Sequence, residues 1–206
     1  MTRIANSRSH GRAYSSQLRA EQAQETRARI LDATVKVMAA GIASVSIPDV
    51  AREAGVSVPT VYRHFGTKQA LLAAVYPHLA HRAGLGQISV PESVDEFREM
   101  VRNVFGRLFS LGDDARVAMT SPASEEARRI QMPSRYAMSR RFAATVMPTV
   151  AKADQDRLAR VLVVLASSSA MRSWLDHLGS SVDEAADDID WLIRTAITAA
   201  PKGKKR

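Results

Sequence analysis

Between Ser57 and Lys68 the chain carries a close succession of side chains that donate hydrogen bonds or hold positive charge. Such groups bind phosphate oxygens, whereas small side chains fit against base edges and thymine methyls in the DNA major groove. We therefore expect residues 58–60 to approach bases, and Tyr62, His64 and Lys68 to hold phosphates. The predicted DNA contacts in and beside this stretch are Ser46, Ser57, Val58, Pro59, Thr60, Tyr62, Arg63, His64 and Lys68.

The other reactive side chains do not follow the motif of an enzyme. His78 and His81 lie three residues apart, a spacing that puts both on one helix face and supplies half a metal site. The sequence contains no His-Glu-x-x-His, no Gly-x-Ser-x-Gly and no glycine-rich phosphate loop. One acidic cluster, formed by Asp187, Asp188 and Asp190, is explained by a solvent-facing helix surface and by the dipole at the helix N-terminus, which favours carboxylates. We expect no catalytic residue, no metal, no cofactor and no enzymatic activity.

The predicted contacts fall on two short helices joined by a tight turn. Ser46 is a suitable N-cap, and Asp49 follows it at the capping-box spacing. Gly55 stands where the first helix must end in a left-handed residue. Ser57 caps the second helix, with Pro59 in its first turn, where a missing N–H leaves no intrahelical bond unmade. The spacing predicts a helix-turn-helix over residues 46–65.

Residues 27–76 closely resemble the DNA-binding domain of the TetR family of transcriptional regulators. The similarity rests on Ala51, on Ala54-Gly55-Val56-Ser57, on Tyr62-Arg63-His64-Phe65, and on Lys68 followed by Leu71-Leu72. The resemblance implies a homodimer that binds a palindromic operator, with Lys68 on a phosphate beside a helix N-terminus. It also adds Thr26 and Arg27 to the predicted DNA contacts, near another phosphate. It further implies a repressor that leaves the operator when a small, lipophilic molecule binds the C-terminal helices. Residues 85–206 resemble the family in layout only.

Composition and charge agree with a DNA-binding regulator. The 206 residues include no cysteine, which excludes disulfides and thiolate metal sites. No apolar run approaches the ~20 residues of a membrane span, and the first ten residues lack the apolar core of a signal peptide. Residues 1–82 carry 11 Lys and Arg against 5 Asp and Glu, whereas residues 83–200 carry 14 against 16. We expect a cytoplasmic protein, not membrane-bound, whose basic N-terminal third touches phosphate.

Helical periodicity predicts an all-α chain in four parts. These are a flexible basic arm over residues 1–20, a DNA-binding domain over 21–83, a ligand-binding and dimerisation domain over 84–200, and a basic tail over 201–206. Two alternatives stay open for the arm: its arginines contact DNA, or it is an idle terminus. They also stay open for Pro77, which either kinks or ends the helix that begins at Lys68. The arginines of the arm are Arg3, Arg8, Arg12 and Arg19.

Within this pattern the first helix is expected over residues 21–40. Beyond a linker at 84–91, helices are expected over 93–111, 124–130, 134–150, 154–178 and 181–200, with an irregular segment over 113–123. The helix over 154–178 is apolar nearly all round and must be covered on several sides. The resemblance implies that the last two helices pair with their copies in a second subunit. The predicted dimer interface comprises Leu162, Leu165, Ser169, Leu192, Ile193 and Ile197.

Methionine and aromatic side chains in the C-terminal part offer an adaptable lining for a ligand, although they also fill ordinary cores. The resemblance implies a pocket among the helices over 93–111, 134–150 and 154–178. Several arginines there, including Arg102, Arg135 and Arg172, are candidates to meet an acidic ligand. The alternative is a DNA-binding regulator without small-molecule input, which a sealed core over 93–178 would favour. The predicted ligand contacts are Phe97, Met100, Val104, Met138, Phe142, Met171 and Trp174.

Overall fold

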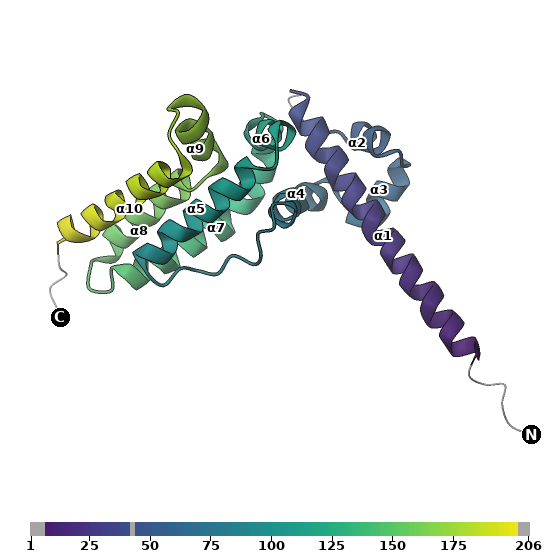
Figure 1. The fold of residues 1–206 in the computed structure, drawn as a ribbon, viewed down its shortest axis with the longest axis horizontal. Coiled ribbons are helices and arrows are strands. Elements are labelled where there is room, and N and C mark those ends of the chain that lie inside the picture. The colour runs from purple at the N-terminus through teal and green to yellow at the C-terminus, as the bar shows by residue number, and fades with distance from the viewer. Residues whose placement is uncertain (1–6, 42–43, 202–206) are drawn as a thin grey trace, which may run out of the picture.

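A computed structural model describes residues 7–41 and 44–201. In this part of the chain every regular element is a helix, as predicted (Figure 1). The N-terminal helices are α1 (Ser7–Ala39), α2 (Ile47–Ala54), α3 (Val58–Phe65) and α4 (Lys68–Arg82). The C-terminal helices, called the body below, are α5 (Val94–Phe109), α6 (Asp113–Thr120), α7 (Ser124–Val146), α8 (Lys152–Leu165), α9 (Ser168–Arg172), a π-helical turn η1 (Ser173–His177) and α10 (Val182–Ala199).

The core runs without interruption from the N-terminal helices into the body. In the first half, α1 packs against α2 and α4, and buried side chains such as Ile30 and Leu72 fill the space between them. In the body, α7 packs along α8 and α5 along α10 (Figure 1). The halves are joined where α1 packs on α6 and where α4 packs on α7. The buried apolar residues of both halves therefore form a single cluster.

Helix α1 is longer than expected: it begins at Ser7 and includes residues 7–20, which the sequence predicted to form an arm before the first helix. Its first half projects away from the rest of the molecule (Figure 1), and residues 17–25 are exposed. An exposed extension needs no apolar stripe, because adding a turn to an existing helix avoids the cost of nucleation. Within it Gln17 donates a hydrogen bond to the Glu21 carboxylate at 3.3 Å. Residues 1–6, including Arg3, and the tail residues 202–206 lie outside the described residues.

The body differs from the prediction at three breaks. Residues 113–120 form α6 instead of an irregular segment, and α7 runs through Pro133 instead of stopping near residue 130. Pro133 and the residue four before it are exposed, so water can satisfy the carbonyl that the proline leaves without a donor. The helix expected over 154–178 is divided at Ala166, after which Ser167 caps α9 by accepting the N–H of Ala170 at 3.1 Å.

Within the described residues no single helix has the length and apolar character to cross a bilayer, and the only pair that meets both limits jointly, residues 152–165 and 168–177, is bent by 55°.

Candidate nucleic-acid interface

Helices α2 and α3 have Ser46 and Ser57 as N-caps, and α2 ends at Gly55, as the sequence predicted. The Ser46 hydroxyl accepts the N–H of Asp49 at 3.2 Å. The Asp49 carboxylate accepts the Ser46 hydroxyl, whereas a capping box would bond the backbone N–H. This hydroxyl, followed by the Arg52 guanidinium, lowers the pKa of Asp49. Gly55 ends α2 in the left-handed region at φ 64°, where a side chain would be strained.

Helix α3 is held by two buried side chains and presents polar groups on its outer side. Val61 and Phe65 are buried. The Ser57 hydroxyl accepts the N–H of Thr60 at 3.3 Å, and the two hydroxyls lie 2.9 Å apart. Tyr62 is 46% exposed although it is a large aromatic residue. The helix can therefore enter a groove with its outer side while Val61 and Phe65 keep it in place.

The residues that flank α3 come from α1. The Arg27 guanidinium lies over the Phe65 ring, 4.7 Å from its centroid, which fixes a cation at the edge of α3. Thr26, one residue earlier, donates its hydroxyl to the Gln22 carbonyl at 2.8 Å. Burial, followed by the charges of Arg63 and Arg27, lowers the pKa of His64. This part of the surface therefore disfavours a further positive charge and suits an anion.

Lys68 begins α4 and has a partner that the sequence did not reveal. Its ammonium lies 2.9 Å from the carboxylate of Glu126, near the start of α7. Thr67, the preceding residue, caps α4 by accepting the N–H of Ala70 at 3.0 Å. Lys68 therefore stands at a helix N-terminus, where backbone amides attract anions, but a carboxylate of the body already contacts it. No sequence pattern links residues that are so far apart in the chain.

Pro77 lies inside α4, which continues through it to Arg82. Proline lacks the N–H that would bond the carbonyl four residues earlier, that of Ala73. The side-chain amide of Gln131, from α7, donates to this carbonyl at 2.9 Å. On the other side of the proline, His78 bonds the Asp32 carboxylate of α1 at 2.8 Å and so helps to hold α4 against α1. The proline thus creates an acceptor through which the body holds α4.

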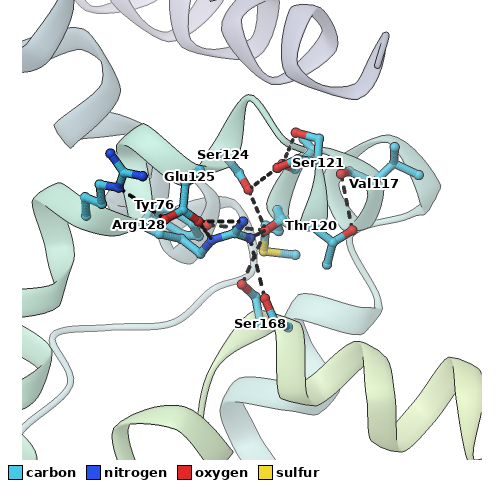
Figure 2. A network of polar contacts seen from close by, with 12 residues as sticks. Tyr76, Val117, Thr120, Ser121, Ser124, Glu125, Arg128 and Ser168 are labelled. Carbon is cyan, nitrogen blue, oxygen red and sulfur yellow. Dashed lines mark hydrogen bonds and ion pairs between the residues drawn. The ribbon is translucent and has the colours of Figure 1, made fainter. Parts of the chain in front are cut away.

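A second attachment of α4 to the body centres on the carbonyl of Met119, at the end of α6. Figure 2 shows Tyr76, Ser124, Arg128 and Ser168 converging on it. The Arg128 guanidinium donates at 2.9 Å and the Ser124 hydroxyl at 3.1 Å. The hydroxyls of Tyr76 and Ser168 each lie at 3.4 Å. Four helices, α4, α6, α7 and α9, are therefore tied to a single acceptor.

Both attachments border a cavity of about 210 Å³. Its wall includes Tyr76 and Gln131, which link α4 to the body at the Met119 and Ala73 carbonyls, and it is otherwise mostly apolar. Five predicted ligand residues line it, namely Phe97, Met100, Val104, Met138 and Met171. Phe142 is outside the lining, stacked behind Phe97 with ring centroids 4.6 Å apart. Trp174 is half-buried in η1 and is also outside the lining.

The surface of α8 and α10 differs from the predicted dimer interface. Leu162 and Ile193 are fully buried within this chain, and Leu162 lines the cavity, so neither offers surface to a second subunit. Their neighbours are exposed instead: Val164 by 61% and Trp191 by 67%. An all-apolar helix does not reveal which stripe faces its own core. Of the remaining predicted residues, Leu165, Leu192 and Ile197 are half-buried and Ser169 is exposed.

Comparisons with known proteins agree with this geometry. Residues 30–75 match the family described as bacterial regulatory proteins, tetR family. A stretch of 63 residues is 41% identical to each of two proteins of Pseudomonas putida, the HTH-type transcriptional regulator SrpR and the uncharacterized HTH-type transcriptional regulator TtgW. The match spans 30% of this chain, 30% of SrpR and 47% of TtgW, so it covers less than half of either relative.

A solved structure resembles most of the fold. It is native NalD, described as the secondary repressor of the MexAB-OprM multidrug efflux pump in Pseudomonas aeruginosa. The TM-score is 0.56 at 18% sequence identity, over 89% of this chain and all of that one, which shows a shared fold. The family match and the capped helix-turn-helix together identify residues 30–75 as a DNA-binding domain of the type found in bacterial regulatory proteins of the tetR family.

Proposed function

We propose that this chain is a sequence-specific, DNA-binding transcriptional regulator. The observation that carries the proposal is the outer side of α3, where Thr60 and Tyr62 stand on a helix anchored by Val61 and Phe65. Lys68, at the start of the next helix, supplies a cation for the adjoining phosphate. The chain would act where the chromosome lies, in the cytoplasm. SrpR and TtgW, whose matching regions are 41% identical, carry the name of transcriptional regulators.

The proposed assembly is a homodimer on a palindromic operator. Val161 and Val164 of α8 and Trp191 of α10 expose large apolar side chains on two helices that pack against each other. Exposed apolar side chains that gather on one surface are typical of an interaction site. A second copy would cover this surface and would set two α3 helices about one turn of DNA apart, at ~34 Å.

The proposed mode of action is repression that ends when a small apolar effector enters the cavity beside α4. The cavity is lined largely by apolar side chains, and its wall holds Tyr76 and Gln131, whose hydrogen bonds attach α4 to the body. An occupant that displaces either attachment shifts α4 and with it the adjoining α3. To control binding, the effector must favour the non-DNA geometry by ~1–3 kcal/mol. The cavity favours this function over regulation without a small molecule.

The test begins with the full chain and a pool of randomised duplex DNA. Repeated selection should enrich a sequence with two inverted half-sites. On that site Lys68→Ala should weaken binding to every DNA and lower the log–log salt slope by about 0.9 for each phosphate that is no longer neutralised. Thr60→Ala should change base preference at an unchanged slope. A pool that stays random would refute the proposed function, and a Lys68→Ala variant that alters preference without altering the slope would refute the assigned roles.

A further inference from the structure

The wall of the 210 Å³ cavity holds one charged residue among the described residues that line it, Arg135 of α7. The Nη2 of its guanidinium donates to the Ala166 carbonyl at 2.8 Å and to the Val163 carbonyl at 3.5 Å. Both bonds come from the same nitrogen, although a guanidinium has five N–H donors on three nitrogens. The side chain is therefore fixed at the end of α8 and retains donors for a further acceptor.

Three of the four other arginines on α7 have carboxylate partners; among the described residues the fourth, Arg141, has none but is exposed to water. Arg128 pairs with Glu125 at 3.2 Å, and Arg140 pairs with Asp156 at 3.0 Å. No Asp or Glu of the described chain lies within ion-pair distance of Arg135, although this residue is partly buried. Burial lowers the pKa of Arg135, and only Tyr76 opposes this shift. A guanidinium keeps its proton even so, which leaves a positive charge that the protein does not neutralise.

We infer that the effector of this cavity is an amphipathic anion, with a carboxylate against Arg135 and an apolar body among Phe97, Met100 and Met138. The inference rests on the proposed function and names the chemical class of its effector. A planar guanidinium with free donors matches a carboxylate through two parallel hydrogen bonds. A cavity of about 150 Å³ holds a benzene, so 210 Å³ suits a molecule of about ten non-hydrogen atoms.

The anion would lie next to the attachment of α4. Gln131 and Arg135 are four residues apart on α7, so they stand on the same face of the helix. The Gln131 amide, which bonds the Ala73 carbonyl, borders the same cavity. A carboxylate on Arg135 is an additional acceptor for that amide, and an occupant that turns the amide away from α4 toward this carboxylate would release the Ala73 carbonyl. The residue that would recognise the charge therefore lies next to the hydrogen bond that holds α4.

The test measures binding of matched probes to the full chain by calorimetry. The probes are octanoate, 1-octanol and octylammonium, and the same three head groups on a 3-phenylpropyl chain. In at least one series the carboxylate should bind about tenfold or more tightly than the alcohol, since a hydrogen bond to a charged group contributes at least one such factor. The ammonium should bind weakest. Equal affinity for carboxylate and alcohol in both series, or no saturable binding of any probe, would overturn the inference.

Substitutions at Arg135 test whether this residue causes the preference for the carboxylate probe over the alcohol. Arg135→Met should bind the alcohol at least as well as the parent chain does and should lose the preference for the carboxylate. The matched control is Arg140→Met, which removes an arginine outside the cavity wall and should keep the preference. If Arg135→Met does not fold, Arg135→Lys keeps the charge and should retain a reduced preference. A preference that survives in Arg135→Met, or is absent from Arg135→Lys, contradicts the role of this residue.

The DNA pool distinguishes the two proposals. Without probe, Arg135→Met should select the same DNA as the parent chain, because the residue is remote from α3. Should the parent chain select no DNA but still prefer carboxylates, the proposed function fails and the cavity's chemistry stands. Should it select DNA but show no preference among the probes, the inference about the effector fails alone.

Discussion

The hydrogen bond from Gln131 to the Ala73 carbonyl predicts an unusual dependence of one mutation on another. Gln131→Met removes the donor while keeping a side chain of similar length. With Pro77 in place the Ala73 carbonyl has no helical N–H to accept, so the variant leaves a partly buried acceptor without its bond. With Pro77→Ala an amide at position 77 can donate to that carbonyl in the ordinary helical pattern.

The expected magnitudes follow from this difference. An unsatisfied, partly buried acceptor costs about 1–3 kcal/mol, so Gln131→Met should lower the free energy of unfolding by about that amount. In the Pro77→Ala background the same substitution should cost less than half as much. The coupling energy between positions 77 and 131 is then about 1 kcal/mol, within the range measured for neighbouring residues that share a network. Pro77→Ala alone should stabilise the chain, because proline inside a helix costs up to about 3 kcal/mol.

The assay is urea unfolding of the four chains of this cycle, followed by circular dichroism. Gln155 provides the control: its side-chain amide donates to the Met147 carbonyl at 2.9 Å, far from α4 in the chain. Gln155→Met should cost the same free energy with Pro77 and with Pro77→Ala. A Gln131→Met penalty that is equal in the two backgrounds would refute the view that α7 replaces the bond that Pro77 deletes.

Three further predictions concern DNA binding and assembly. Glu126→Gln should free the Lys68 ammonium at the start of α4 and tighten DNA binding by up to about fivefold, since exposed ion pairs are worth up to ~1 kcal/mol. The control, Glu125→Gln, removes the same charge one residue away and should have a smaller effect. Equal effects in titrations on DNA would show that only net charge matters. Val164→Glu should yield a folded monomer by light scattering and abolish tight operator binding. Val117→Glu, at another exposed valine, should stay dimeric, and a monomeric parent chain would refute the proposed dimer. Because the pKa of His64 is lowered, its imidazole is neutral in the free protein at neutral pH and would take up a proton beside a phosphate. DNA affinity should therefore rise as the pH falls toward and below the ordinary imidazole pKa of about 6.5, and His64→Gln should flatten the profile; identical profiles would exclude a phosphate contact at this residue.

The helix-turn-helix was predictable because its limits are set locally. A serine hydroxyl that caps a helix, a glycine at positive φ and a proline in a first turn act within three or four residues of their own position. Ser46, Gly55 and Ser57 accordingly stand where the sequence predicted. The capping box of Ser181 and Glu184 at the start of α10 is set locally in the same way.

What could not be predicted depends on contacts between distant residues. The partner of Lys68 comes from α7, and the donor for the Ala73 carbonyl comes from the same helix. Neither contact leaves a periodic signal in the sequence. The apolar stripe of α8 was recognised but its orientation was not, so Leu162 was expected on the surface where Val164 is found. For Arg135 the sequence showed an arginine among many; only the packing sets it apart.

The packing of α1 on α6 has a consequence for building chimeric regulators from this chain. The sequence suggests a cut in the linker over residues 84–91, which would separate the DNA-binding helices from the body. Val35 of α1 is 2% exposed, and it borders the same surface recess as Ala115 of α6, itself buried. A fragment that ends at the linker would uncover this side of α1 to water and would be prone to aggregate. A transplant that retains α6, or replaces Val35 with a polar residue, should yield the better-behaved module.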